Sequence, residues 1–307
     1  MAFNHVTVLL HETVDSINVK EGGVYADLTL GGGGHTALIL ERGGTVFGID
    51  RDMTAIENAR ERFADKPFSA VHGNFADIES IAARCGVEEF DGIIADLGVS
   101  SPQLDDARRG FSYMQDAPLD MRMDQSGGIT ARDVVNSYSE QELCRVISSY
   151  GEERWAARIA KFITDRRKNK SIETTFDLVD IIKAAIPQNV RRDGPHPAKR
   201  TFQAIRIEVN GELKILEQTV RSGVSLLKKG GRMSVITFHS LEDRIIKTTF
   251  ADLAHGCTCP KDFPVCVCGK KAQVRIITKK PILPTEEETA ANPRARSSKL
   301  RCAEKII

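Results

Sequence analysis

The sequence predicts an α/β fold, in which a parallel β-sheet with helices on both faces is interrupted by an all-helical insert. Two observations support this fold class. In the first third of the chain, short and nearly all-apolar segments alternate with helical patterns. A long helical stretch follows, and strand patterns return only near the end. We therefore expect one discontinuous α/β domain, residues 1–105 and 210–307, around a loop and helical insert at residues 106–209.

The first part of the chain contains four predicted strands and two predicted helices. Because strands buried on both faces are short and apolar, we assign strands to residues 24–28, 45–49, 68–71 and 93–97. Helices are expected at residues 36–42 and 52–64, the second capped by Asp52. Open parallel sheets bind ligands at the carboxyl ends of their strands, so we expect the functional site at that edge.

The insert is predicted to begin with a loop and to continue as helices. Residues 107–130 are rich in Gly, Asp, Met and Pro and have no regular period, which is typical of a functional loop. Ser139 and Glu142 have the spacing of a capping box and predict a helix start. Thr174 and Asp177 predict another in the same way.

The last part of the chain returns to the α/β pattern. A helix closed by Gly230 and Gly231 leads into a predicted strand at residues 232–238. Ser240 is expected to cap the helix that follows, and residues 274–278 form a last predicted strand. These elements complete the sheet that the first part begins.

Composition excludes several classes of protein. The 307 residues include 43 Lys and Arg against 42 Asp and Glu, a net charge of +1, which excludes a uniformly basic nucleic-acid coat and an acidic disordered protein. No apolar run approaches the roughly 18 residues that a membrane span needs. Because no signal peptide is visible, we expect a cytoplasmic protein without membrane contact.

Four consecutive glycines, residues 31–34, join the first predicted strand to a helix. Such a loop allows close approach of backbone to a ligand, and the helix start offers free N–H groups. Gly32, Gly34 and Ala37 also fit the permissive form of the nicotinamide dinucleotide fingerprint. Asp50 lies near the spacing that this fingerprint expects for ribose recognition. By itself, the loop leaves the cofactor open.

Polar side chains at the strand ends favour one cofactor. Asp27, Asp50 and Asp96 end three predicted strands, and Asn74 with Phe75 follows another. S-adenosylmethionine needs such a rim, with a carboxylate for the ribose hydroxyls, an apolar wall for adenine and glycine backbone beside the methionine moiety. A pyrophosphate would be repelled by the additional acids. The rim therefore favours S-adenosylmethionine.

Eight motifs spread along the chain are LGGGGH (30–35), DLGVSSPQLD (96–105), RGFS (109–112), PLDMR (118–122), YGEER (150–154), RTFQAIR (200–206), FHSLEDR (238–244) and NPRARSS (292–298). Together they resemble the bacterial ribosomal RNA small subunit methyltransferase H family, also called MraW. The resemblance covers nearly the whole chain, and its many separate blocks make coincidence an inadequate explanation.

The resemblance implies a class I, Rossmann-like S-adenosylmethionine-dependent methyltransferase sheet with a helical insertion after the fourth strand. It implies methyl transfer to N4 of a cytidine in the decoding region of 16S rRNA, within the small ribosomal subunit. The residues that match the family's cofactor contacts are Gly33, Gly34, His35, Asp50, Phe75, Asp96 and Gln103.

Two other functions are weighed against this one. A nicotinamide-dependent oxidoreductase fits the glycine loop but neither the acidic rim nor the motifs outside that loop. A non-catalytic RNA-binding module would bind RNA without saturable binding of S-adenosylmethionine, and calorimetry separates the two.

Transfer to the exocyclic amine of cytosine requires in-line positioning and an acceptor that draws electron density onto nitrogen. The usual Pro-Pro-aromatic motif of enzymes that act on such amines is absent after residues 93–97. We expect Asp96, Ser100 or Ser101 to accept the amine hydrogens. His239, which follows the strand at residues 232–238, is a further catalytic candidate, although a histidine at a strand end is more often structural.

Basic side chains in the insert are candidates for contact with RNA phosphates, which gives the insert a role in substrate recognition. They are Arg122, Arg166, Arg167, Lys168 and Arg200. The loop at residues 109–123 also carries Phe111 and Tyr113, which are candidates for stacking on a flipped base. A solvated charged face and an ordered Ω-loop are the alternatives.

The seven cysteines fall into two groups. Cys85, Cys144 and Cys302 are isolated and are expected to be small buried side chains. The cluster is Cys257, Cys259, Cys266 and Cys268. Two Cys-x-Cys pairs resemble a small zinc knuckle, but the usual spacing is longer, so zinc and a metal-free cluster both stay open.

Overall fold

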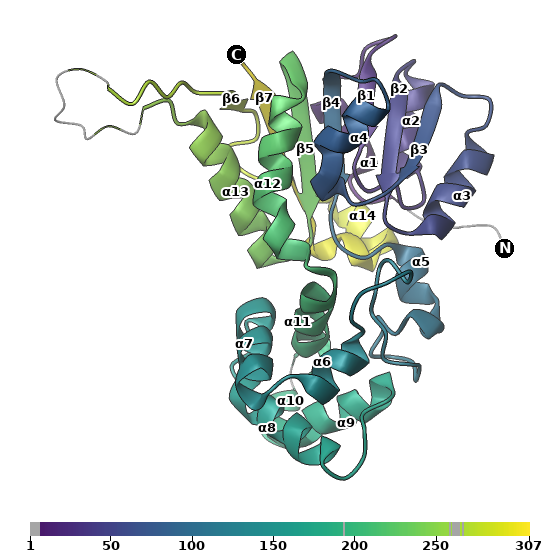
Figure 1. Cartoon of the computed structure of the whole chain (residues 1–307), viewed down its shortest axis with the longest axis vertical. Helices are drawn as coiled ribbons and strands as arrows, with labels where there is room; N and C mark the ends of the chain where they lie inside the picture. Colours follow the sequence, from purple (N-terminus) through teal and green to yellow (C-terminus); the bar gives the residue numbers. More distant parts are fainter. Residues whose placement is uncertain (1–6, 193, 258, 260–264, 266) are drawn as a thin grey trace. The chain divides into compact units, whose positions relative to one another are not determined.

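The computed structural model describes residues 7–192, 194–257, 259, 265 and 267–307. It divides into two compact units (Figure 1). Unit 1 consists of Met1–Gly98 and Leu213–Ile307, and unit 2 of Val99–Glu212. Within the described residues, no helix is long and apolar enough to cross a membrane.

Unit 1 is built on a sheet that has seven strands among the described residues, in the order β3-β2-β1-β4-β5-β7-β6 (Figure 1). The strands are β1 Val24–Asp27, β2 Thr45–Asp50, β3 Phe68–His72, β4 Phe90–Asp96, β5 Leu227–Thr237, β6 Val274–Ile276 and β7 Lys299–Lys305. Strands β1 to β5 pair in parallel, and β7 runs antiparallel to both β5 and β6. The predicted α/β class is confirmed.

Helices cover both faces of this sheet. The helices of unit 1 are α1 Leu10–Ser16, α2 Gly34–Glu41, α3 Met53–Arg62, α4 Ile78–Arg84, α12 Glu212–Ser225, α13 Ser240–Ala254 and α14 Glu286–Ala291, with 3-10 turns at Phe75–Asp77 and Pro293–Ser297. Successive residues of a strand face opposite sides of a sheet. Tyr25 of β1 accordingly packs with Ile39 and Ile56 of α2 and α3, whereas Ala26 belongs to the cluster of α12 and α13.

The strand register brings acidic side chains to one edge of the sheet. Asp27 pairs with Gly48, two positions before Asp50 ends β2, and it also pairs with Ile94, two positions before Asp96 ends β4. Because these strands are parallel and adjacent, all three carboxylates lie at the carboxyl edge. This arrangement confirms the prediction that the strands carrying Asp27, Asp50 and Asp96 end at the same edge of the sheet.

Two local predictions in unit 1 are wrong. Helix α12 ends at Ser225, and Gly230 and Gly231 lie inside β5, where the register with β4 shifts. A Cβ at position 231 would come within 2.9–3.1 Å of three backbone oxygens, so the irregular pairing itself requires glycine there. Helix α13 is capped by His239, and Ser240 is its first helical residue. By contrast, the predicted cap of α3 by Asp52 is confirmed.

Unit 2 is helical in its described residues. Its helices are α5 Ser101–Asp105, α6 Ala131–Ser137, α7 Glu140–Gly151, α8 Ala156–Arg167, α9 Thr175–Ala185, α10 Gln188–Arg191 and α11 Lys199–Asn210, with a 3-10 turn at Ala107–Arg109. The predicted capping boxes begin α7 and α9 as expected. An apolar core with residues from α7, α8, α9 and α11 joins these helices, including Leu143, Ile159, Leu178 and Phe202.

Candidate functional site

The glycine loop between β1 and α2 is held in a tight turn. The amide of Gly33 donates to the carbonyl of Leu30 at 2.7 Å, and Leu30 donates to Ile49 of β2 at 3.0 Å. Gly33 has a φ of 71°, which favours glycine. At Gly34 a Cβ would stand 1.8 Å from Oγ1 of Thr7. The glycines at positions 33 and 34 are therefore required by this backbone path, which fixes the amides at the start of α2.

Asp50 ties the loop to the end of β2. Its Oδ2 accepts from the amide of Gly31 at 2.8 Å, and its Oδ1 accepts from the amide of Asp52 at 2.8 Å. Burial raises the pKa of Asp50, while these backbone hydrogen bonds oppose the rise. Each oxygen retains a second lone pair, so the carboxylate has the acceptors that a ligand hydroxyl needs.

Asp27 is buried at the end of β1, with 1% of its surface exposed. Its carboxylate accepts from Oγ1 of Thr36 at 2.8 Å and from the amide of Thr29 at 3.2 Å. Burial nevertheless raises the pKa of Asp27 to about 6, and the charge of Asp50 adds to the rise. This carboxyl therefore titrates close to neutral pH.

Asp96 ends β4 beside Asp27. Its backbone amide donates to Oγ1 of Thr29 at 2.6 Å, which joins the ends of β1 and β4. Its side-chain Oδ1 is buried and has no hydrogen-bond partner in the described part of the chain. Burial raises the pKa of Asp96 well above its usual range, and the charges of Asp27 and Glu242 raise it further.

We call Asp27, Asp96 and Glu242 the acidic cluster. Asp27 and Glu242 are buried, and Asp96 is half-buried with its Oδ1 buried. Burial and neighbouring negative charges raise the pKa values of Asp27 and Asp96 and so oppose their ionised forms. A cationic ligand beside them would relieve the repulsion and give Oδ1 of Asp96 a partner. Strongly perturbed carboxyls at the ligand edge of an α/β sheet are typical of a functional site.

Glu242 and His239 define the start of α13. Oε2 of Glu242 accepts from the amides of Phe238 and His239 at 2.8 and 3.3 Å, and Nδ1 of His239 accepts from the amide of Glu242 at 3.4 Å. Nε2 of His239 lies 3.1 Å from Oε1 of Glu242. The candidate catalytic histidine is therefore the N-cap of a helix, and it orients one member of the acidic cluster.

The other predicted contacts are distributed over both units. In unit 1, Nε2 of His35 donates to the carbonyl of Val8 at 3.2 Å, and Phe75 is half-buried at the start of a 3-10 turn. In unit 2, Ser100 caps α5 and its amide donates to Oε1 of the buried Gln103 at 3.2 Å. Ser101 is the first residue of α5. The site roles of these residues stay predictions.

Sequence reasoning missed Thr29, Thr36 and Glu242 as parts of this site. Thr29 follows Asp27 by two positions, and a hydroxyl so close to a strand end is a usable signal. Glu242 lies three residues after His239, but histidine is a rare N-cap, so the capping box could not be recognised from residue types. Thr36 reaches Asp27 across the loop, which no spacing rule predicts.

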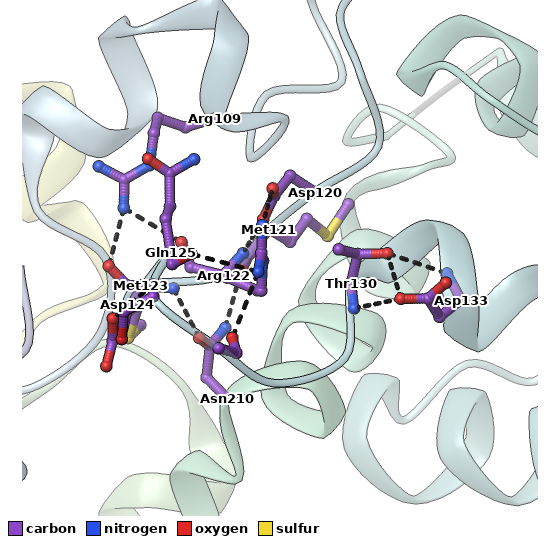
Figure 2. A network of polar contacts seen from close by, with 12 residues as sticks. Arg109, Asp120, Met121, Arg122, Met123, Asp124, Gln125, Thr130, Asp133 and Asn210 are labelled. Atoms are coloured by element: carbon purple, nitrogen blue, oxygen red, sulfur yellow. Dashed lines mark hydrogen bonds and ion pairs between the residues drawn. The ribbon is translucent and has the colours of Figure 1, made fainter.

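In unit 2, the loop that carries Arg122 is held by a polar network (Figure 2). Arg122 forms a bidentate ion pair with Asp120, with contacts of 2.9 and 2.8 Å. Asn210 of α11 donates to the carbonyl of Met121 at 2.8 Å and accepts from the amide of Met123 at 2.8 Å (Figure 2). Arg122 thus helps to hold its own loop through the ion pair with Asp120. Its contact with RNA stays a prediction.

The loop aromatics pack inside unit 2. Phe111 is buried in the apolar core. Tyr113 stacks on His196 with ring centroids 4.7 Å apart and meets Phe202 edge-on. In the structure both rings therefore pack against unit 2 itself, as in the ordered Ω-loop alternative, and are not presented for stacking on a base.

The basic candidates of α8 and α11 differ in their contacts. Arg166 and Lys168 are exposed, and Lys168 pairs with Asp165 at 2.7 Å. Arg167 donates to the carbonyl of Val135 at 2.7 Å, and Arg200 donates to that of Glu152 at 2.8 Å. Arg167 and Arg200 therefore also bind the protein's own backbone.

The sulfur atoms of Cys257, Cys259 and Cys268 lie within 4.8 Å of one another. Cys266, the fourth cysteine of the predicted cluster, lies outside the described residues. Among the isolated cysteines, Cys302 is buried in β7, as expected, whereas Cys85 and Cys144 are half-buried. The three cysteines of the cluster thus form a group separate from the acidic cluster.

The fold and the site define a class of protein. The central strand order, the antiparallel β7, the glycine loop after β1 and the acids at the ends of β1, β2 and β4 are those of a class I, Rossmann-like methyltransferase. The nicotinamide alternative places a pyrophosphate at this loop, which the neighbouring buried carboxyls would repel.

Comparison with known proteins places the chain more narrowly. A model of the MraW methylase family matches residues 2–306, and the chain belongs to that family. It is 55% identical to the ribosomal RNA small subunit methyltransferase H of Clostridioides difficile (strain 630), with both chains fully covered. It is 56% identical to the protein of the same name from Clostridium botulinum (strain Kyoto / Type A2), again with full coverage.

Among solved structures, an rRNA methylase from Streptococcus thermophilus matches with a TM-score of 0.43 and 8% identity, covering 99% of each chain. The assignment of the fold rests on the strand order and not on this similarity.

Proposed function

We propose that the chain transfers a methyl group from S-adenosylmethionine to N4 of a cytidine in the decoding region of 16S rRNA. The substrate is the rRNA of the small ribosomal subunit, and the reaction takes place in the cytoplasm. Membership of the MraW methylase family and full-length identity to small subunit methyltransferases H support the reaction. The observation in the fold that carries it is the buried Oδ1 of Asp96 at the ligand edge, which has no hydrogen-bond partner among the residues that the structure describes.

The residues of unit 1 fit this cofactor. S-adenosylmethionine, when bound, supplies a methyl group on a positively charged sulfur and also carries an ammonium group. The acidic cluster of Asp27, Asp96 and Glu242 favours a cation, which lowers the pKa of neighbouring carboxyls and restores their charge. Asp50 offers acceptors for ribose hydroxyls, and Phe75 offers an apolar wall. Gly33, Gly34 and His35 present backbone at the start of α2.

Asp96 has the chemistry that methylation of an amine needs. In its ionised form, Oδ1 accepts a hydrogen from the N4 amine, which raises electron density on nitrogen as the new bond forms. The same oxygen then takes the proton that N4 must lose. Because Oδ1 has no competing donor within the described residues, it is available for this contact. Ser100, Ser101 and His239 stay as further candidates for the same role.

The phosphate contacts of the RNA are assigned to the basic side chains of unit 2. Arg166 and Lys168 are exposed, and Lys168 pairs with the exposed Asp165 of its own helix end, whereas Arg122, Arg167 and Arg200 keep hydrogen bonds to their own unit. Lysine and arginine contacts to phosphates provide affinity and position rather than base specificity.

The direct test is transfer of labelled methyl groups. The full chain is incubated with methyl-labelled S-adenosylmethionine and either small ribosomal subunits or naked 16S rRNA. We expect label in 16S rRNA with at least one of the two substrates, and strongly reduced label with Asp96→Asn. Saturable RNA binding without label in either substrate would overturn the proposed function.

A further inference from the structure

Outside the acidic cluster, the structure brings three cysteines together on one segment of unit 1. We call residues 255–273, which join α13 to β6, the arm (Figure 1). At its base, the amide of Gln273 donates to the carbonyl of Leu253 at 2.8 Å. Cys257 lies on the outgoing side of the arm and Cys268 on the returning side, yet their sulfur atoms are 3.8 Å apart.

The spacing of the sulfur atoms matches a metal site. In a tetrahedral zinc site with Zn–S bonds of about 2.3 Å, neighbouring sulfurs are about 3.8 Å apart. The separation of 3.8 Å between Cys257 and Cys268 equals this edge, and Sγ of Cys259 lies within 4.8 Å of both.

Backbone amides already point at two of these sulfurs. The amide of Cys259 donates to Sγ of Cys257 at 3.4 Å, and the amide of Val267 donates to Sγ of Cys259 at 3.4 Å. Such N–H donors stabilise the thiolate, which is the form that binds metal. The backbone of the arm therefore supplies outer-shell contacts for thiolate ligands.

Two apolar side chains of the described part of the arm do not bring its two sides together. Val265 and Val267 are 69% and 74% exposed, so these side chains do not close the arm by burial. Thiolates select thiophilic cations, and zinc at a site of this kind supplies folding free energy to small segments without a core.

We infer that Cys257, Cys259 and Cys268 bind a structural zinc ion that fastens the outgoing side of the arm to the returning side. The three thiolates occupy three of the four positions that zinc takes in structural sites. This inference concerns metal binding and is independent of the methyl transfer proposed above.

The experiment measures metal on the full chain. Zinc per chain is determined by mass spectrometry after reconstitution and desalting, for the wild type and for Cys257→Ser, Cys259→Ser and Cys268→Ser. Cys85→Ser and Cys144→Ser are matched controls outside the cluster. We expect about one zinc per chain in the wild type and controls, and a severalfold loss in each cluster variant. Equal zinc in wild type and cluster variants would overturn the inference.

Cobalt substitution of the wild type gives a second readout that does not depend on any variant. Tetrahedral thiolate ligation gives intense sulfur-to-cobalt charge-transfer bands, which zinc then displaces. A spectrum without these bands, or a disulfide between Cys257 and Cys268 found by mass after alkylation, would contradict the site. Trypsin cleavage after Lys271 should also become severalfold faster when a chelator removes the metal, and an unchanged rate would show that the metal does not fasten the arm.

Discussion

At the scale of single residues, the acidic cluster determines how unit 1 responds to pH. Burial raises the pKa of Asp27 to about 6, above the value of about 4 expected in the unfolded chain. Below pH 4 this carboxyl is protonated in both the folded and the unfolded state, so its burial does not lower the unfolding free energy. As the pH rises from about 4 through 6, the unfolded chain ionises this carboxyl first, and the folded state must then hold a buried charge. The unfolding free energy therefore falls over this range.

Asp27→Asn isolates this effect. A rise of the pKa of Asp27 from 3.8 to about 6 corresponds to about 3 kcal/mol. Relative to Asp27→Asn, the ligand-free wild type should lose up to about that much unfolding free energy between pH 4 and pH 7. Urea unfolding of both proteins across this range measures the difference, in which the carboxylates that do not interact with Asp27 cancel. A difference that is constant, or that changes in the wild type's favour as the pH rises, contradicts the account.

Asp96→Asn tests the preference of the acidic cluster for a cation. The variant keeps the size of the side chain and removes its charge. Affinity for S-adenosylmethionine should fall roughly tenfold more than affinity for S-adenosylhomocysteine, because the product lacks the sulfonium charge. Single-turnover methylation at saturating cofactor should fall about 100-fold. Calorimetry with the two ligands gives the first ratio, and equal losses of affinity would remove the electrostatic argument.

At the scale of elements, substitutions of His239 at the start of α13 distinguish a structural role of this histidine from a catalytic one. Replacing His239 with Ala removes the N-cap and should lower the unfolding free energy by about 1 kcal/mol. Asn is a good N-cap, so His239→Asn should restore most of this loss. If the ring acts only as a cap, His239→Asn keeps the methylation rate near that of the wild type. A stable His239→Asn protein that is inactive would instead assign the ring a catalytic role.

The strands that build the site could be predicted because their signal is local. Buried parallel strands are apolar along their whole length, and parallel neighbours end at one edge, so Asp27, Asp50 and Asp96 could be placed together before the structure was known. The glycine loop could be located for the same reason, since it directly follows such a strand.

The elements that sequence reasoning missed depend on distant partners. Strand β7, Lys299–Lys305, mixes charged and apolar residues without regular alternation, and its charges pair with residues far away along the chain. Arg301 pairs with Asp243 at 2.6 Å, and Glu304 accepts from Arg232 at 2.9 Å. Ion pairs between residues so far apart in the sequence leave no signal in the local residue pattern. Oδ1 of Asp96, which has no hydrogen-bond partner in the described part of the chain, likewise lies near the charges of Asp27 and Glu242 from distant parts of the sequence, and only the fold reveals this.

At the scale of the whole molecule, a net charge of +1 conceals separate concentrations of charge. Acids gather at the carboxyl edge of unit 1, and bases gather at the end of α8 in unit 2, where Arg166, Arg167, Lys168 and Lys170 follow the single acid Asp165. The first suits a cationic cofactor and the second suits a polyanion. Composition alone excludes a uniformly basic protein, but it does not show where acidic and basic side chains gather in the structure.

Salt dependence tests the assignment of RNA contacts to unit 2. The variant Arg166→Gln/Lys168→Gln/Lys170→Gln removes exposed charges at the end of α8 and leaves Arg167, which binds the backbone. The slope of log binding constant against log salt should fall by roughly two units, since each phosphate contact contributes about 0.7 to 0.9. The matched control, Lys66→Gln/Lys214→Gln/Lys247→Gln, removes exposed charges of unit 1. If both triple variants change the slope equally, α8 is not a specific contact.

The most direct test of the central claim is the chemical identity of the methylated nucleoside. After reaction with small ribosomal subunits or 16S rRNA, the RNA is digested to nucleosides and analysed by chromatography and mass spectrometry, and the modified position is mapped. We predict N4-methylcytidine at one position in the decoding region, formed about 100-fold more slowly with Asp96→Asn. A methyl group on C5 of the base, on a ribose hydroxyl or at a site outside the decoding region would contradict the proposed function.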